Sequence, residues 1–359
     1  MKYALNIKKL LQNEEGFLTQ SREETAFSLF AFAPAWLRSG IALRISILLI
    51  LLLLPACGSA PSVSAIEPPY IDTGIDSNAW VTVPAGEFPF GQHDHMSYVD
   101  EFEIMVTDVT VEQFANFLNE ALAAGEIRVG EFEVEAGEIL WQEEGVGGYY
   151  PGDPFDGYKH EEEIKAGEKL YMPQTEGLRL TYDGNTFTTM EAYTNHPMTM
   201  VTWWGANAYC EYYGYRLPLE AEWEKAARGT ELINERGLPF PWGDEIHGNN
   251  ANYYSSFDLF ERMFGKLGNT TPVGFYNGQT YDLGEGSYAT EDSTSPYGLY
   301  DMAGNVWQWM GDDYHDQHYR YMRGGSFYSY EVDLRVWKNN SAGPQYYSPA
   351  LGFRCVQDQ

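Results

Sequence analysis

Basic residues are scarce in this chain of 359 amino acids. It has 22 lysines and arginines against 52 aspartates and glutamates, for a formal net charge of −30 at pH 7. Phosphate binding needs clustered basic side chains, and those present here are scattered, so this deficit argues against a nucleic-acid partner. The acidic surface either favours cations and basic partners or serves only solubility.

Recognisable catalytic motifs are also missing. No Ser/His/Asp arrangement and no glycine-rich phosphate loop stands out. Short-spaced histidines occur at His93 and His95 and again at His315 and His318. These pairs could ligate a transition metal, but two histidines are a weak signal, and solvated loop residues are the commoner explanation. Hydrophobic residues make up 44% and aromatic residues 16% of the chain, which is ample for the core of one large domain or two small ones.

Long apolar runs are scarce too, and the main one lies near the N-terminus. The ten residues from Ile45 to Leu54 are apolar apart from Ser46, with Arg38 and Arg44 before them. A helix of ten residues is too short to span roughly 30 Å of hydrocarbon. The run therefore predicts a secretory signal over residues 1–56, cleaved after a small residue. A start codon assigned too far upstream would explain its unusual length.

The end of this segment, Leu54-Pro-Ala-Cys57, resembles the bacterial lipoprotein box. The resemblance implies that Cys57 becomes the acylated N-terminus and anchors the protein in a membrane. Gly58 follows it, which in similar lipoproteins favours the outer membrane. We expect a location at the bacterial outer membrane or cell surface, with the periplasmic side left open. Residues 57–78 are rich in Ser, Pro and Ala and predict a flexible tether before a domain over residues 79–359.

Residues typical of helix starts and glycines at the ends predict two helices in this domain. Val111 to Leu122 places apolar residues on one face, with Thr107–Thr110 offering capping oxygens and Gly125 a stop. A second helix begins near Pro218, carries acids in its first turn and bases in its last, and ends at Gly229. A further helical pattern runs from Ala206 to Tyr212.

Strand signals are weaker. A hairpin is expected within residues 80–91, another strand at 99–106, a hairpin over 178–191 turning at Asp183-Gly184, and a short strand at 271–276. Residues 124–173 are acidic, aromatic and glycine-rich and predict a long surface insertion. Residues 297–355 lack any sustained period and predict turns surrounded by aromatic side chains.

Eight sequence blocks occur in a fixed order: residues 84–88, 109–114, 201–210, 216–224, 241–244, 298–309, 323–326 and 352–355. Together they resemble the formylglycine-generating enzyme (sulfatase-modifying factor) family. The resemblance covers about residues 80–356 and implies an α+β domain with a C-type-lectin-like fold. In that fold two helices pack against small antiparallel sheets, with much irregular chain.

Enzymes of this family oxidise a sulfatase cysteine with O2, and the resemblance places their two copper-binding cysteines shortly after Arg323-Gly-Gly-Ser326. A soft Cu(I) centre needs thiolate ligands. Here the second cysteine position falls on Glu331 and the first near Tyr328 or Ser329, and residues 327–337 contain no cysteine. We therefore expect no copper centre and no catalytic residues. The alternative is an oxidase that uses residues not recognised from the sequence.

The resemblance also implies a calcium site. Asp301 and Gln308 would supply side-chain oxygens and Gly304 and Val306 backbone oxygens, a donor set that suits a hard cation. The family usually has Glu where Gln308 stands, which weakens the expectation. A second family site matches only at Asn252 and the carbonyl of Tyr253. Without a metal, Asp301 would only satisfy loop amides.

The two remaining cysteines form an even pair in an exported protein, where oxidation is allowed. The resembling family joins the positions of Cys210 and Cys355 by a disulfide. The alternative is a pair of buried free thiols, since small buried cysteines are common.

The function expected from these features is a non-catalytic ligand-binding or structural module. Tyr, Trp and Asn provide rigid contact area and adaptable hydrogen bonds at interfaces. The layout also resembles the variable proteins of diversity-generating retroelements, and the partner would be an unidentified protein or carbohydrate. Some of these side chains could instead pack in the core. The expected binding surface consists of Tyr328, Tyr330, Trp337, Asn339, Asn340, Tyr346 and Tyr347.

Overall fold

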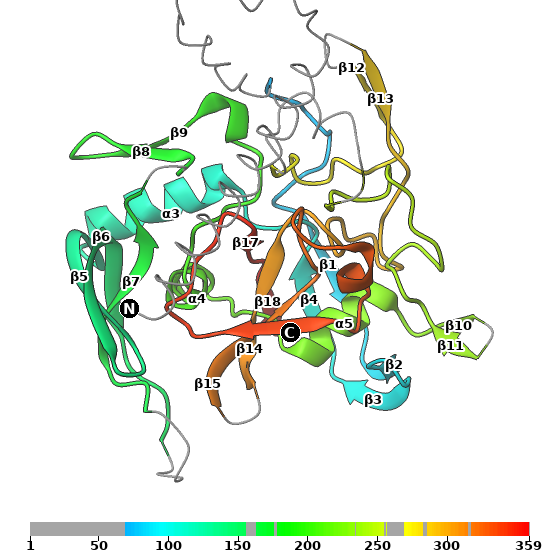
Figure 1. The fold of residues 1–359 in the computed structure, drawn as a ribbon, viewed down its shortest axis with the longest axis horizontal. Helices are drawn as coiled ribbons and strands as arrows, with labels where there is room; N and C mark the ends of the chain where they lie inside the picture. The colour runs from blue at the N-terminus through cyan, green and yellow to red at the C-terminus, as the bar shows by residue number, and fades with distance from the viewer. Residues whose placement is uncertain are drawn as a thin grey trace, which may run out of the picture. The chain divides into compact units, whose positions relative to one another are not determined.

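Three α-helices and a set of small sheets make up the described part of a computed structural model (Figure 1). All described residues belong to one unit, residues 65–359. No helix among them is long and apolar enough to cross a membrane. The described residues are 69–155, 163–175, 178–233, 235–254, 256, 269–282, 286–314 and 317–358, with only the backbone at 313–314 and 317–318.

Several features expected from the sequence lie outside these residues. They are the signal segment 1–56, the acylation site Cys57, most of the tether, His315 and the side chain of His318.

The helices form where their end signals predict them. Helix α3 (Val111–Ala124) begins at Thr110, whose hydroxyl accepts from the Gln113 backbone N–H while the Gln113 side chain accepts from the Thr110 N–H. Gly125 ends it in the left-handed conformation, with φ at 76°. Helices α4 (Trp203–Tyr212) and α5 (Glu220–Arg228) follow, so the described residues hold one helix more than the resemblance implied.

The sheets are small and, with one exception, antiparallel, so the mixed α+β class is correct. The exception is the parallel pair of β14 with β17. The sheets, in spatial order, are β1 (Trp80–Val83), β4 (Phe102–Met105), β18 (Val356–Asp358); β2 (Gly86–Phe90), β3 (His95–Val99); β5 (Ile127–Ala136), β6 (Ile139–Tyr150), β7 (Gly167–Pro173); β8 (Leu180–Tyr182), β9 (Phe187–Thr189); β10 (Leu232–Ile233), β11 (Arg236–Gly237); β12 (Thr280–Asp282), β13 (Ser287–Ala289); and β16 (Asn339–Ala342), β15 (Gln317–Arg323), β14 (Trp307–Tyr314), β17 (Leu351–Gly352). Short 3-10 helices are η2 (Glu191–Tyr193) and η3 (Glu331–Leu334).

Strand pairing corrects several expectations. The hairpin β8–β9 is confirmed, but β1 and β2 do not pair with each other, since β1 pairs with β4 and β2 with β3. Residues 271–276 form no strand. The segment 297–355 contains strands β14 to β17 instead of turns alone.

The acidic insertion is also more regular than its composition indicated, because β5, β6 and β7 form a three-stranded sheet (Figure 1). Its glycines suggested loops, yet they lie within a strand. A Cβ on Gly147 would lie 2.1 Å from the Lys169 carbonyl oxygen and 2.5 Å from the Phe132 ring. Glycine is needed there for close packing inside the sheet, not for a turn.

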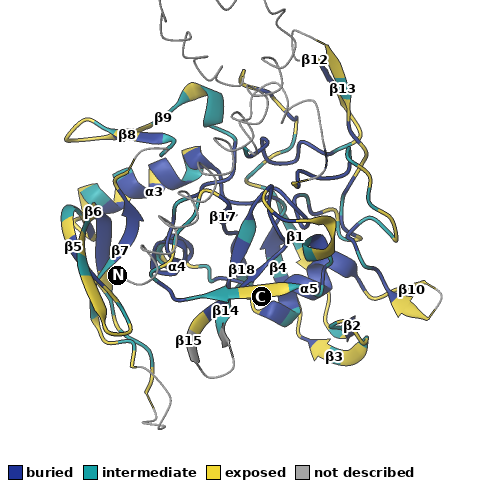
Figure 2. Ribbon diagram, in the orientation of Figure 1, coloured by how far each residue is buried: buried dark blue, intermediate teal, exposed yellow. Residues whose placement is uncertain are grey.

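Most of the helical surface is buried, as Figure 2 shows. Phe114, Phe117 and Leu118 of α3 share a core with Trp203, Tyr209 and Cys210 of α4. Cys210 and Cys355 are fully buried and joined by a disulfide, as expected. This bond ties α4 to the residue that precedes β18.

The end of the expected tether belongs to the domain. Ile71 is buried beside Phe275 and Tyr281, and the Thr73 hydroxyl donates to the Val273 carbonyl at 2.9 Å. The side-chain amide of Asn195 donates to the Ile71 carbonyl at 2.7 Å. One buried apolar side chain and two hydrogen bonds thus attach residues 71–73 to the domain.

Candidate functional site

A polar cavity of about 510 Å³ opens in the C-terminal part of the described structure. It collects side chains from the start of β14, from β15 and β16, from the loop after β15 and from the loop before β17. We call it the C-terminal cavity. It is lined by Trp307, Met322, Ser326, Tyr328, Ser329, Asp333, Asn339, Asn340, Tyr346, Ser348, Ala350 and Leu351.

Four of the seven expected binding residues line this cavity: Tyr328, Asn339, Asn340 and Tyr346. The other three are elsewhere. The ring of the exposed Tyr330 packs against that of Tyr254, with centroids 5.1 Å apart. Trp337 lies beneath the guanidinium groups of Arg228 and Arg335, and Tyr347 packs beside the Phe132 core cluster.

The loop that forms one wall depends on two glycines after β15. Gly324 and Gly325 have φ angles of 96° and 73°, in the left-handed region. A Cβ on Gly325 would lie 2.9 Å from Leu334 Cδ1. The tight turn lets the Ser326 backbone N–H donate to the Ser329 hydroxyl at 3.0 Å, which places both serines at the cavity.

Two neighbouring amides in β16 are held in opposite orientations. Asn339 Nδ2 donates to a Glu220 carboxylate oxygen at 2.9 Å, which leaves Asn339 Oδ1 as an acceptor. Asn340 Oδ1 accepts from the Ser341 backbone N–H at 2.9 Å, which leaves Asn340 Nδ2 as a donor. A carboxylate cannot donate here and a backbone N–H cannot accept, so their partners determine both orientations.

Sequence reasoning missed several lining residues, among them Trp307, Asp333 and Ser348. Trp307 and Ser326 occur inside blocks that carry the family resemblance, which was a usable signal. Asp333 and Ser348 had no signal. The Asp333 carboxylate forms no hydrogen bond or ion pair with any described residue.

Behind the cavity lies a buried ionic network. Arg323 donates to Glu220 at 2.6 Å and to Glu224 at 2.9 Å, and Arg228 donates to Glu224 at 2.8 Å. Burial raises the pKa of Glu224, while Arg323 and Arg228 lower it. Of the residues that the sequence assigned to the helix dipole of α5, Glu220 pairs with Arg323 and Arg228 pairs with Asp94 as well as with Glu224. Lys225 donates instead to the backbone carbonyls of Pro84 and Gly86.

A second buried hub surrounds Arg354. Its guanidinium donates to Gln308 Oε1, to Asp108 and to the backbone carbonyls of Met105, Val106 and Tyr300. Burial raises the pKa of Asp108 to about 8, against the opposing effect of Arg354. Such a saturated guanidinium has a structural role, since each of its partners is a protein group.

The expected calcium ligands differ in how far hydrogen bonds already occupy the lone pairs of their oxygen atoms. Gln308 Oε1 accepts from both Trp223 Nε1 and Arg354 Nε, and Gln308 Nε2 donates to the Asp301 carbonyl. With both lone pairs engaged, this oxygen has none left for a cation. Asp301 is buried, and one of its carboxylate oxygens accepts from the Gly274 N–H at 2.7 Å.

Asn252 fits a cation better. Its Oδ1 is buried and has no hydrogen-bond partner among the described residues, whereas its Nδ2 donates to the Asn269 carbonyl. The backbone of Gly304 lies close by, because a Cβ there would be 2.6 Å from the Asn252 carbonyl oxygen. Val306 is buried one residue before β14. Calcium binding at Asp301, Gly304, Val306 and Asn252 stays a prediction, and the hydrogen bonds of Gln308 argue against its expected part in the site.

Of the two positions that the resemblance aligns with copper-binding cysteines, the first lies at the C-terminal cavity and the second lies outside its lining. Tyr328 and Ser329 line the cavity, and Glu331 is exposed at the start of η3. Within the described residues, no three His, Cys, Asp or Glu side chains gather in a way that could hold a metal. His93 and His95 have ring centroids 6.2 Å apart, and Asp94 between them is paired with Arg228.

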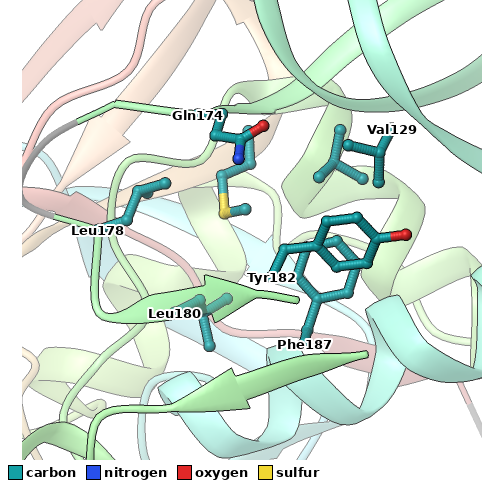
Figure 3. Close-up of a pocket in the computed structure, with 8 residues that line it drawn as sticks. Val129, Gln174, Leu178, Leu180, Tyr182 and Phe187 are labelled. Atoms are coloured by element: carbon teal, nitrogen blue, oxygen red, sulfur yellow. The ribbon is translucent and has the colours of Figure 1, made fainter. Parts of the chain in front are cut away.

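A second, much smaller cavity of about 30 Å³ lies beside β8 and β9 (Figure 3). Leu178, Leu180 and Phe187 line it, and the rings of Tyr182 and Phe187 stack with centroids 4.5 Å apart. Its volume is about that of one water molecule. It is a packing gap and not a ligand site.

Curated relatives match about half of this chain. A segment of 167 residues is 36% identical to the inactive C-alpha-formylglycine-generating enzyme 2 of Bos taurus, covering 45% of this chain and 50% of the relative. The formylglycine-generating enzyme of Streptomyces coelicolor is 33% identical over 185 residues, which cover 46% of this chain and 53% of the relative. The serine/threonine-protein kinase Pkn1 of Chlamydia trachomatis is 35% identical over 184 residues, which cover 46% of this chain and only 25% of the kinase. The matched segment thus spans a quarter to about half of the length of these relatives.

Solved structures show a more distant likeness. CarF aligns with a TM-score of 0.46 at 22% identity, covering 78% of this chain and 97% of that one. PvdO from Pseudomonas aeruginosa aligns with a TM-score of 0.46 at 20% identity, covering 82% and 99%. A domain-family match is more extensive than the matches to curated relatives, because residues 72–359 match the sulfatase-modifying factor enzyme 1-like domain. The chain therefore belongs to the sulfatase-modifying factor enzyme 1-like domain family.

Proposed function

We propose that this chain is a non-catalytic ligand-binding module whose ligand occupies the C-terminal cavity. One observation carries the proposal. The cavity includes the position near Tyr328 or Ser329 where the resemblance places the first copper-binding cysteine of the active enzymes, and the second position falls on the exposed Glu331, so neither position holds a thiol. Hydroxyl groups do not replace thiolates around a soft copper ion.

The cysteines elsewhere in the domain support this proposal. Cys210 and Cys355 are consumed by the disulfide, so the described residues contain no free thiolate. The inactive formylglycine-generating enzyme 2 of Bos taurus is similar to this chain to about the same degree as the formylglycine-generating enzymes. A family member without the oxidase activity is therefore an established outcome.

The rim of the cavity fits a binding role. Tyr328 and Tyr346 are about half exposed, and Asn339 and Asn340 are exposed beside them. The two tyrosines lie on loops, and tyrosine rings offer contact area at low entropic cost, while Asn339 and Asn340 lie on β16. A refinement is that these positions vary between gene copies, as in diversity-generating retroelements. Sequencing the gene in related strains tests it, since variation confined to the cavity residues is expected, and uniform substitution along the chain would contradict it.

An aerobic turnover assay tests the non-catalytic assignment. The purified mature protein, loaded with copper, is incubated with a sulfatase-motif peptide, and formylglycine is measured by mass spectrometry. The formylglycine-generating enzyme of Streptomyces coelicolor, under the same conditions, serves as the positive control. We expect no product. Product at multiple turnovers would overturn the proposal and favour an oxidase that uses other residues.

The location is part of the same proposal. The lipoprotein box at Cys57 supports export and anchoring at the outer membrane or cell surface. Labelling cells with a radioactive fatty acid is expected to mark the wild-type protein and not the Cys57→Ser variant. Equal labelling of both proteins would contradict acylation at this residue.

A further inference from the structure

We propose that the C-terminal cavity takes a neutral, hydroxyl-rich ligand, a saccharide of one to two rings. This inference rests on the proposed function and names the chemical class of its ligand. It is carried by the charge, the hydrogen-bonding groups and the aromatic rings that line the cavity.

The charge of the lining excludes anionic ligands. Among the twelve lining residues there is one carboxylate, Asp333, and no lysine, arginine or histidine. The nearby guanidinium of Arg323 is buried and already paired with Glu220 and Glu224. A phosphate, sulfate or carboxylate entering the cavity would meet a negative group without a compensating cation.

The remaining polar groups are neutral, which favours hydroxyls over a cation. They are the hydroxyls of Ser326, Ser329 and Ser348, those of two tyrosines, and two amides. Asn339 offers an acceptor and the adjacent Asn340 a donor, because each is held by its protein partner. A sugar hydroxyl both donates and accepts, so the hydroxyls of one saccharide can pair with the Asn339 acceptor, the Asn340 donor and the Asp333 carboxylate.

Aromatic rings supply the second half of saccharide recognition. Trp307, Tyr328 and Tyr346 line the cavity, with Tyr328 51% and Tyr346 47% exposed. Aromatic faces are electron-rich and attract the C–H groups on the apolar face of a sugar ring. Only Met322, Ala350 and Leu351 are aliphatic in the lining, so an oily ligand would leave many polar groups unpaired.

The size and rigidity of the cavity agree with this class. About 510 Å³ lies in the range of roughly 300–1,000 Å³ that small-molecule sites occupy. Asn339 is held by Glu220, whose same oxygen accepts from the buried Arg323 at 2.6 Å. A side chain ordered before binding loses little entropy when the ligand arrives.

A glycan array carrying neutral, anionic and amine-bearing saccharides, together with a lysine-rich peptide, tests the inference with the mature protein. We expect binding to neutral glycans that stays unchanged between low and high salt. Titration calorimetry with the best neutral glycan then compares variants. Asn340→Ala and Tyr346→Ala are each expected to weaken binding at least tenfold. Asn185→Ala and Tyr98→Ala, exposed residues outside the cavity, are the matched controls and are expected to bind as wild type.

The Asp333→Asn variant separates the ligand classes, because it keeps the side-chain shape and removes the charge. A neutral glycan is expected to bind about tenfold more weakly, equivalent to about 1.4 kcal/mol. Tighter binding of an anionic probe, or salt-sensitive binding of the peptide that Asp333→Asn abolishes, would overturn the saccharide class while keeping a binding module. Failure of every neutral glycan to bind would also overturn the class. Formylglycine turnover, in contrast, would overturn the proposed function itself.

Discussion

Two polar regions within residues 297–355 differ in how their hydrogen-bonding groups are used. Around Gln308 and Arg354 the polar atoms are buried and engaged by protein partners. Around Asn340 and Tyr346 they are exposed at a cavity and open to a ligand. Burial without a partner is costly, so nearly all polar atoms of the first region are paired, Asp108 Oδ2 being an exception among the described residues, whereas the second region is solvated until a ligand arrives. We infer that the first region serves stability and the second binding.

The largest effect on the buried region is expected from its disulfide. Replacing Cys210 and Cys355 by Ala removes a link between residues 145 apart, which the chain-entropy relation values at about 5 kcal/mol before native-state strain. Unfolding in urea, with and without reductant for the wild type, measures it. If the double variant is as stable as the oxidised wild type, the link contributes nothing.

Arg354 is the next test of the buried region. Arg354→Met removes the partner of the Asp108 carboxyl group and one of the two donors to Gln308 Oε1, and is expected to cost about 3–5 kcal/mol. Glu168→Gln is the control, since it breaks a pair with Arg128 in which both side chains are about half exposed, and should cost under about 1 kcal/mol. Equal losses in the two variants would contradict the comparison.

Calcium would add to the stability of the buried region alone. If Asn252 and Asp301 hold the ion, calcium at about 100 times its Kd is expected to stabilise the fold by about 2.7 kcal/mol. Metal analysis of protein purified without chelator, and melting before and after chelation, measure this. No bound calcium together with an unchanged Tm would rule the site out.

Asp312 lies at the border of the two regions, where its carboxylate accepts from the Glu220 backbone N–H. Burial, with a smaller contribution from Glu220, raises its pKa to about 6 from an ordinary value of 3.8. The folded state therefore holds this proton more tightly, and the associated stability is complete below pH 3.8 and lost as the pH rises through 6.

Between pH 4 and pH 7, we expect the free energy of unfolding to fall by about 1 kcal/mol more for the wild type than for Asp312→Asn. This is less than the full linkage value, because the Asp312 side chain is partly exposed. Urea unfolding at four pH values checks this, and parallel stability curves for the two proteins would refute it.

The smallest effects on stability are expected at the cavity. Tyr346→Ala and Asn340→Ala should change the free energy of unfolding by no more than about 0.5 kcal/mol, because both side chains are exposed. Thermal melting measures it beside the binding titrations. A large stability loss in either variant would assign that side chain to the fold and not to the ligand.

Much of the fold could be predicted where the signal is local. Helix α3 begins at Thr110, which exchanges hydrogen bonds with Gln113, and ends at Gly125. In each hydrogen bond the two partners lie within a few residues of each other, so a short stretch of sequence contains both. The same holds for the Asp183-Gly184 turn of β8–β9. The family and its α+β class also followed from ordered blocks of sequence.

Features that depend on contacts between residues far apart in the sequence were decided by the tertiary structure. The separation of β1 from β2, and the sheet at residues 127–173, follow from pairing and packing across the chain. Asp333 and Ser348 joined the cavity although no motif marks them, because only the folded loops bring them beside Trp307. From the sequence alone, the charged side chains of Arg323 and Arg354 would be expected at the solvent-exposed surface. Their burial required carboxylates and carbonyls from up to 249 positions away, and that juxtaposition exists only in the folded chain.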